Sequence, residues 1–294
     1  MLVDLVRTVT TDGMRLDGAL FAPAENVESR VAVDAVLCLH GVGASFYSSS
    51  TLEALVPHLT ELGLSTLIVN TRGHDSVHTA VMTVGRRRQG AALEIVDESR
   101  LDIAGWCKLL AERGMRRILL LGHSLGAVKA IYSQALEPHS QVVGIVAASA
   151  PRLSYAAFSN SFESSLFLES MTTAESMAKA GRGSELFTAK FPFPLLISAD
   201  SYIDKYGPAE RYNILRFAAQ MTVPSLCTYG SKELATGGIA FAGVPEALRD
   251  LPGKCNTLDI EIVENADHVY TGVTDKLGST IVEWLIGRLP VAST

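Results

Sequence analysis

The sequence of 294 residues contains only four cysteines, and no two of them are close together in the chain. They are Cys38, Cys107, Cys227 and Cys255. Wide spacing of this kind lacks both the framework of a disulfide-stabilised secreted domain and the short ligand spacing of a zinc site. We therefore expect four small buried side chains in a reducing compartment, with no disulfide and no bound metal.

Long apolar segments are also missing. No run approaches the roughly 18 apolar residues that would indicate a membrane-spanning helix. Asp4, Arg7 and Asp12 interrupt the N-terminal stretch, where a signal peptide would have its apolar core. The formal net charge of -6 argues weakly against nucleic acid as a partner. These absences favour a cytoplasmic protein without a membrane span.

The chain does have a large apolar fraction, because 48% of its residues are hydrophobic and 19% are charged. Short, wholly apolar segments alternate with segments of helical periodicity, which is typical of an α/β protein with a mostly parallel central sheet flanked by helices. Residues 2–10 and 16–21 instead alternate apolar and polar side chains around a turn, which predicts an antiparallel hairpin at the edge of the sheet.

The alternation stops between Arg152 and Met221, where Ser, Phe, Met and Ala dominate. A stretch of this length is too long for a plain crossover between strands. We predict a core of residues 1–151 and 222–294, with residues 152–221 inserted as a mostly helical cap. The pattern leaves open whether Phe167 lines a substrate pocket or packs inside the cap.

Two further predictions concern the region before the cap. A long loop of roughly 20 residues should follow the strand at 65–70, and it contains Arg86, Arg87 and Arg88. Such a basic run usually forms a solvated face, with anion binding as the alternative. A helix is expected over residues 94–112.

The most informative stretch begins with four apolar residues, Ile118 to Leu121, and continues as Gly122-His123-Ser124-Leu125-Gly126 before a helical segment. A G-x-S-x-G pattern between a buried strand and a helix is typical of a nucleophile elbow. The tight turn lifts the Ser124 hydroxyl clear of the sheet. The N–H of Leu125, at the start of the helix, is free to face a developing oxyanion.

A second glycine-rich loop follows the predicted strand at 31–40. It reads His40-Gly41-Val42-Gly43-Ala44-Ser45, so the G-x-G-x-x-G spacing of dinucleotide-binding folds is absent. The H-G-x-G form fits an oxyanion loop, with the Val42 N–H as the donor.

A serine nucleophile needs a base that is itself oriented by an acid. Of the seven histidines, His268 follows the last predicted strand, where a loop could carry it to Ser124. The acid should precede it in the chain. Glu233, just after the predicted strand at 222–229, is the first choice, and Asp200 and Asp204 are the alternatives.

Together these motifs resemble the α/β-hydrolase superfamily, and most closely its esterase and serine-aminopeptidase-type branch. The motifs are H-G-V-G at 40–43, N-T-R-G-H at 70–74, G-H-S-L-G at 122–126, G-S-K-E at 230–233 and A-D-H at 266–268. The resemblance implies Ser124 as nucleophile, Glu233 as acid and His268 as base. It also implies Val42 and Leu125 as oxyanion donors, and no cofactor.

Two positions depart from that branch. Asp75 stands where glycine often follows R-G-H, and Glu233 replaces the more usual aspartate. The first change is expected at the pocket rim. The expected reaction is hydrolysis of a small or medium, fairly apolar acyl ester through an acyl-Ser124 intermediate. Amide, lactone or carbon–carbon bond hydrolysis, or a non-catalytic ligand receptor on the same fold, are the alternatives. The sequence leaves the oligomeric state open.

Overall fold

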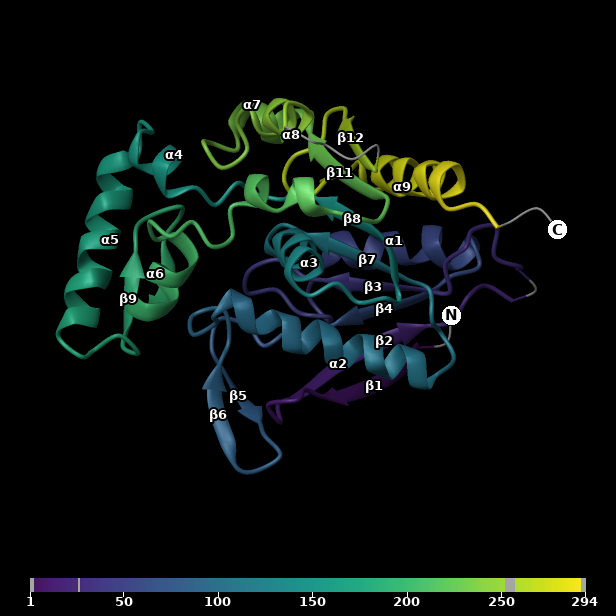
Figure 1. Cartoon of the computed structure of the whole chain (residues 1–294), viewed down its shortest axis with the longest axis horizontal. Helices are drawn as coiled ribbons and strands as arrows, with labels where there is room; N and C mark the ends of the chain where they lie inside the picture. The colour runs from purple at the N-terminus through teal and green to yellow at the C-terminus, as the bar shows by residue number, and fades with distance from the viewer. Residues whose placement is uncertain (1–2, 26, 252–256, 292–294) are drawn as a thin grey trace.

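The computed structural model describes residues 3–25, 27–251 and 257–291, and its centre is one eight-stranded sheet (Figure 1). The strand order is β1-β2-β4-β3-β7-β8-β11-β12. β1 pairs antiparallel with β2, β2 pairs antiparallel with β4, and all other neighbours are parallel. The strands are β1 (Val3–Val9), β2 (Arg15–Phe21), β3 (Ala35–Leu39), β4 (Ser65–Val69), β7 (Ile118–His123), β8 (Val142–Ala148), β11 (Ser225–Gly230) and β12 (Leu258–Val263). The predicted fold class and edge hairpin are confirmed.

Helices cover both faces of this sheet, so the strands of its parallel part are buried on two sides. Leu119 and Leu121 of β7 share one core with apolar residues of α1 (Ser50–Glu61) and α9 (Thr274–Arg288). Ile118 and Leu120 share the opposite core with residues of α2 (Ser99–Glu112) and α3 (Leu125–Leu136). Burial on both faces explains why these strands appear in the sequence as short, wholly apolar runs.

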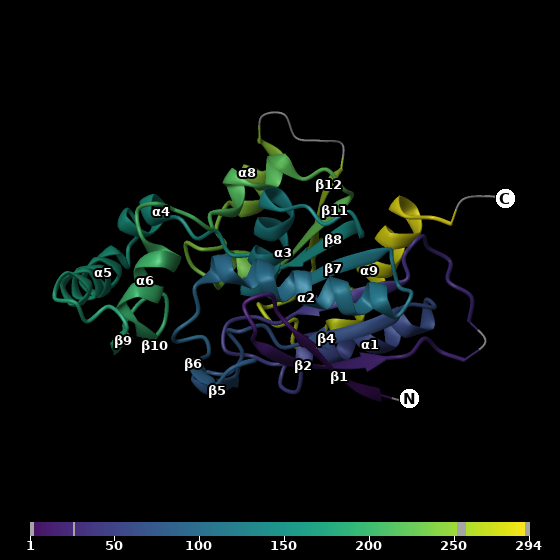
Figure 2. The same cartoon turned by 60° about the horizontal axis from the view of Figure 1, so that its bottom comes forward.

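Residues 152–206 lie beyond one end of the central sheet in both views, and the chain then returns toward α3 (Figures 1 and 2). The 152–221 segment is not purely helical, because β9 and β10 form an antiparallel hairpin within it. Its elements are α4 (Tyr155–Ser159), α5 (Ser164–Lys179), β9 (Leu186–Ala189), β10 (Leu195–Ser198), α6 (Ala199–Tyr206), and the short 3₁₀ helices η2 (Ile214–Arg216) and η3 (Ala218–Gln220). After it, α7 (Ser231–Thr236) and α8 (Val244–Arg249) separate β11 from β12.

Phe167 packs inside this segment and does not line a pocket. Its side chain is fully buried. Its ring lies 5.2 to 5.5 Å, between centroids, from three other rings of the segment, those of Tyr155, Phe158 and Phe191. Edge-to-face clusters of this kind stabilise a small core.

The predicted loop after β4 is wrong, because it contains a hairpin of β5 (His78–Val81) and β6 (Arg86–Gln89). The three arginines lie on β6 and are exposed, and Arg87 forms a 4.0 Å ion pair with Glu98. The predicted helix at 94–112 also starts later, at Ser99, after the short 3₁₀ helix η1 (Val96–Glu98). Glu94 precedes both helices, and its carboxylate is buried in an ion pair with Lys129.

Three of the four cysteines lie in the described residues. Cys38, Cys107 and Cys227 are buried and unbonded to one another, as predicted. Cys255 lies outside the described residues. In the parts of the chain that the structure describes, no helix has both the length and the apolar character needed to cross a membrane.

Candidate active site

The turn between β7 and α3 places Ser124 at the carboxyl ends of the parallel strands. Ser124 has φ 56° and ψ -122°, a backbone conformation that side-chain-bearing residues rarely adopt. The two flanking glycines allow it. A Cβ on Gly122 would lie 2.3 Å from the Gly126 backbone, and a Cβ on Gly126 would lie 2.1 Å from the Leu39 carbonyl oxygen. The elbow therefore requires glycine on both sides of the serine.

The side chains of Ser124, His268 and Glu233 form a continuous hydrogen-bonded line. His268 Nε2 lies 3.0 Å from Ser124 Oγ, and His268 Nδ1 lies 2.5 Å from Glu233 Oε1. The loop after β12 carries the histidine, and α7, directly after β11, carries the glutamate. Because these strands are parallel to β7, their carboxyl ends bring the three residues to the same edge of the sheet.

The Glu233 carboxylate is fully buried, and each oxygen has a partner. Its Oε2 accepts a hydrogen bond from the Ser149 hydroxyl at 2.8 Å and from the Gly230 N–H at 3.2 Å. The Ser149 hydroxyl also lies 3.1 Å from the Tyr270 hydroxyl. These donors fix the plane of the carboxylate toward the His268 ring.

The loop that carries His268 is held at several points. The Asp267 carboxylate accepts from the N–H groups of Val269 and Thr271 at 3.1 and 2.9 Å. His123 Nε2 donates to the His268 carbonyl at 2.7 Å. Burial and the nearby His268 ring lower the pKa of His123 to about 4, so this ring stays neutral. The position of His268 thus depends on the residue next to the nucleophile.

Two backbone N–H groups belong to residues that adjoin Ser124 in space or in sequence. A Cβ on Gly41 would lie 3.1 Å from the Ser124 Cβ, so the loop after β3 passes directly beside the serine. The N–H of Val42, the next residue, has no hydrogen-bond partner among the described residues. Leu125 is the first residue of α3, so its N–H has no carbonyl of its own helix to donate to.

A cavity of about 280 Å³ opens at these groups. Its lining includes apolar side chains, among them Phe193, which is the residue that the 152–221 segment contributes. It also includes hydroxyl-bearing residues just before and at the start of α1. The lining residues are Gly41, Val42, Ala44, Ser48, Ser49, Ser50, Thr51, His123, Ser124, Phe193, His268 and Val269.

The sequence model described as the alpha/beta hydrolase family matches residues 36–285. The chain belongs to this family.

Several solved α/β hydrolases share the fold at low sequence identity. GrgF from Penicillium sp. sh18 superposes with a TM-score of 0.72 at 13% identity, over 98% of this chain and 99% of that one. Est1E from Butyrivibrio proteoclasticus with ferulic acid bound gives 0.67 at 15%, over 96% and 99%. The esterase PF2001 of Pyrococcus furiosus gives 0.62 at 17%, over 98% and 92%. No curated protein sequence matches the chain significantly.

The alternative acids of this α/β hydrolase lie elsewhere. Asp200 and Asp204 are both on α6. Asp204 is ion-paired with Arg211 and accepts from the Tyr212 hydroxyl at 2.7 Å. Among the described residues, the hydrogen bonds of the His268 ring go to Glu233 and Ser124 alone.

Asp75 does not line the cavity at Ser124, although its N–H donates at 3.2 Å to the carbonyl of Ala44, which does. Its φ of 54° is left-handed, which explains why glycine is frequent there in the branch that the chain resembles. The Asp75 carboxylate accepts from the Tyr47 hydroxyl at 2.5 Å and lies 3.0 Å from His74 Nδ1. Tyr47 and His74 line a separate cavity of about 530 Å³ beside β1 and β2.

Sequence reasoning missed several residues that support this hydrolase site. The Ser149 hydroxyl donates to the Glu233 carboxylate and lies beside the Tyr270 hydroxyl. The His123 ring donates to the backbone carbonyl of His268. Ser149 follows the carboxyl end of β8, a position that the parallel sheet pattern could have pointed to. The His40 ring is also buried, and its Nδ1 lies 2.7 Å from the Gly41 carbonyl oxygen.

Proposed function

We propose that this chain is a serine hydrolase that cleaves a small or medium acyl ester through a covalent acyl-Ser124 intermediate. One observation carries the proposal. A single imidazole, that of His268, bridges the Ser124 hydroxyl at 3.0 Å and the buried Glu233 carboxylate at 2.5 Å. A neutral hydroxyl is a weak nucleophile, and this geometry supplies both the base and the group that orients the base.

In the first half-reaction the Ser124 oxygen attacks the ester carbonyl carbon while His268 Nε2 takes the hydroxyl proton. Glu233 stabilises the imidazolium formed, because its carboxylate already faces Nδ1. The negative charge on the former carbonyl oxygen is met by the N–H groups of Val42 and Leu125. When the tetrahedral intermediate collapses, the imidazolium gives its proton to the departing alkoxide, and the acyl group stays on Ser124.

In the second half-reaction His268 removes a proton from a water molecule that attacks the acyl-serine. The same two N–H groups stabilise the second oxyanion. Collapse returns the proton to the Ser124 oxygen and releases the carboxylic acid. The sum is one ester and one water converted to one acid and one alcohol, so the protein returns to its starting state.

Esters are the preferred substrate class for two reasons. The apolar lining residues and the volume of about 280 Å³ suit an acyl chain of small or medium size. Similar solved structures from Pyrococcus furiosus, Rhodothermus marinus and Exiguobacterium antarcticum are called esterases, and another, Est1E, has ferulic acid bound. Turnover of a graded panel of p-nitrophenyl esters, beside lactones and aminoacyl amides, tests the proposal. Cleavage of the lactones or amides but none of the esters would contradict it.

The proposal predicts a specific pH dependence. Only a neutral imidazole accepts the Ser124 proton, so kcat/KM should fall on acidification as a single base becomes protonated. Protonation of the two buried histidines near Ser124 does not account for a fall above pH 4, because burial lowers the pKa of His40 to about 3 and that of His123 to about 4. The measurement is kcat/KM against pH, with far-ultraviolet circular dichroism at each point. A profile unchanged down to pH 4 would exclude a histidine base.

The proposal also predicts which aromatic residue sets chain-length preference. Phe193 lines the cavity, whereas Phe167 is buried in the packing of the 152–221 segment. Phe193→Ala enlarges the cavity, so kcat/KM should rise for longer acyl chains relative to butyrate, by about fourfold for each additional methylene that becomes buried.

Phe167→Ala is the matched control for this experiment. It should lower the melting temperature while leaving the relative rates across the ester panel unchanged, because its ring contacts other rings of the same segment. The assignment of Phe193 to the acyl pocket is contradicted if Phe193→Ala keeps the wild-type order and ratios of rates.

A further inference from the structure

The oxyanion loop is connected to a buried chain of polar groups that the mechanism above does not use. The Gly41 carbonyl and the Val42 N–H belong to one peptide group, and in a trans peptide they point in opposite directions. The Gly41 carbonyl oxygen lies 2.7 Å from His40 Nδ1. It also accepts from the Ala44 N–H at 3.3 Å. By bonding to the Gly41 carbonyl, His40 therefore fixes the orientation of the Val42 N–H at the opposite edge of the same peptide group.

The hydrogen bonds of the His40 ring define its tautomer. Its Nε2 lies 3.1 Å from the Thr71 N–H, which can only donate, so Nε2 carries no proton. Nδ1 must then hold the proton and donate it to the Gly41 carbonyl. Burial and the neighbouring charge of Lys129 lower the pKa of His40 to about 3, which keeps the ring neutral.

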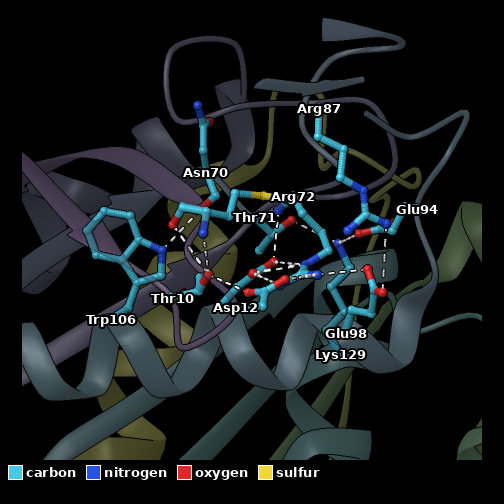
Figure 3. A network of polar contacts seen from close by, with 12 residues as sticks. Thr10, Asp12, Asn70, Thr71, Arg72, Arg87, Glu94, Glu98, Trp106 and Lys129 are labelled. Atoms are coloured by element: carbon cyan, nitrogen blue, oxygen red, sulfur yellow. Dashed lines mark hydrogen bonds and ion pairs between the residues drawn. The ribbon is translucent and has the colours of Figure 1, made fainter. Parts of the chain in front are cut away.

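Lys129 stands at the other end of this chain of groups, on α3 behind the nucleophile. Its side chain is buried, and Nζ donates to Thr71 Oγ1 at 2.9 Å (Figure 3). Thr71 Oγ1 in turn lies 3.1 Å from His40 Nε2. Since the ammonium group can only donate, the Thr71 hydroxyl accepts a hydrogen bond from it and donates its own O–H to His40 Nε2.

A buried carboxylate holds the Lys129 ammonium in place. Glu94 Oε1 lies 2.5 Å from Lys129 Nζ, and Glu94 Oε2 lies 3.8 Å from Nζ of Lys205, which is on α6 of the 152–221 segment. Burial alone would raise the pKa of Glu94, but the two lysines outweigh it and keep that pKa below its ordinary value. A Cβ on Gly73 would lie 2.1 Å from Glu94 Oε1, so the carboxylate has no room to move toward the loop after β4.

We propose that Lys129 is a positioning residue of the oxyanion hole and acts on the Gly41–Val42 peptide through Thr71 and His40. The inference rests on the proposed function, because it concerns the same reaction. Every link donates in the same direction, from ammonium to hydroxyl to imidazole to carbonyl. Hydrogen bonds arranged in this way polarise one another, most strongly in a buried site. A carbonyl that accepts from this chain makes the N–H of its own peptide group a better donor to the oxyanion.

The sharpest test removes one link and leaves all charges in place. Thr71→Val deletes the hydroxyl between Lys129 and His40, whereas Thr71→Ser keeps it. Loss of a whole oxyanion donor costs on the order of 10² to 10³ in kcat, so weakening one should cost about tenfold. We expect Thr71→Val to lower kcat by about this factor with KM within about twofold, and Thr71→Ser to restore most of it.

Thr66→Val is the matched control, because Thr66 is a buried threonine on β4 whose hydroxyl has no hydrogen-bond partner among the described residues. It should leave kcat unchanged. Affinity for a trifluoromethyl ketone, which adds to Ser124 and forms an oxyanion, should fall for Thr71→Val by the same factor as kcat. A purely structural role for Thr71 would lower stability without this parallel loss.

One measurement is independent of activity and of how the variants fold. Nitrogen-15 NMR of the wild-type imidazoles should show His40 with a protonated Nδ1 and an unprotonated Nε2. The opposite tautomer overturns the inference, and so does wild-type kcat and ketone affinity in Thr71→Val. A wild-type protein that neither hydrolyses any ester nor binds the ketone would instead overturn the proposed function, and the inference with it.

Discussion

Ser124→Ala should lower kcat for the best ester by a factor on the order of 10⁴ to 10⁶, the loss typical when a triad nucleophile is removed. In the proposed mechanism this hydroxyl is the group that attacks, and no other described side chain donates a hydrogen bond to His268 Nε2. The fold should persist, because alanine keeps the Cβ that serine already places at φ 56°. The measurement is kcat for the purified variant and wild type.

Circular dichroism and the melting temperature serve as the control for this variant, and both should match the wild type. A variant that is folded and retains more than about a tenth of the wild-type kcat would remove Ser124 from its assigned role.

Glu233→Gln should lower kcat by a factor on the order of 10² to 10⁴, by analogy with loss of the orienting acid in other triads. Glu233 Oε1 accepts from His268 Nδ1, while Oε2 accepts from the Ser149 hydroxyl and the Gly230 N–H. A glutamine must turn its NH₂ group toward one of these sets of donors. If it faces His268, the proton is forced onto Nε2, and the ring can no longer act as a base toward Ser124.

Three further variants sharpen this result. Glu233→Asp keeps the charge but draws the carboxylate back by about one methylene, so kcat should fall less than in Glu233→Gln. Asp204→Asn and Asp200→Asn should leave kcat nearly unchanged, because both carboxylates are on α6 and neither is bonded to the His268 ring. If Asp204→Asn or Asp200→Asn lost most of its kcat while Glu233→Gln kept it, the orienting acid would be on α6 and not Glu233.

Much of the fold and site could be predicted because local patterns fix them. The apolar run before Gly122 marks a strand that is buried on both faces. Glycine is required on both sides of Ser124, because a Cβ at either position would lie only 2.1 to 2.3 Å from backbone atoms. Parallel strands then place their carboxyl ends together, so residues that follow successive strands, such as Glu233 and His268, meet at Ser124.

The predictions failed where long-range contacts outweigh local pattern. The arginines at 86–88 have no apolar alternation, yet they form a strand because β5 provides a partner. The helical pattern of the following residues predicted that the helix begins at Glu94. Instead, Glu94 lies before the helix, with its carboxylate buried in an ion pair with Lys129.

Side-chain roles within the 152–221 segment were equally hidden. Phe167 and Phe193 are both phenylalanines of this segment, and the sequence does not distinguish their roles. The packing of the segment buries Phe167 and places Phe193 at the cavity. Thr71 is 31 residues from His40 and 58 residues from Lys129 in the chain, so no sequence motif contains these hydrogen-bonded residues.

The most direct test of the account is the site of covalent labelling by a fluorophosphonate, mapped by peptide mass spectrometry. The probe reacts rapidly only with a serine that a base has activated, the role proposed for His268, whose Nε2 lies 3.0 Å from Ser124 Oγ. The account predicts one adduct per chain, on Ser124, and none in Ser124→Ala. A wild-type protein that stays unlabelled, as expected of a non-catalytic ligand receptor, or that carries the adduct on another residue, would contradict it.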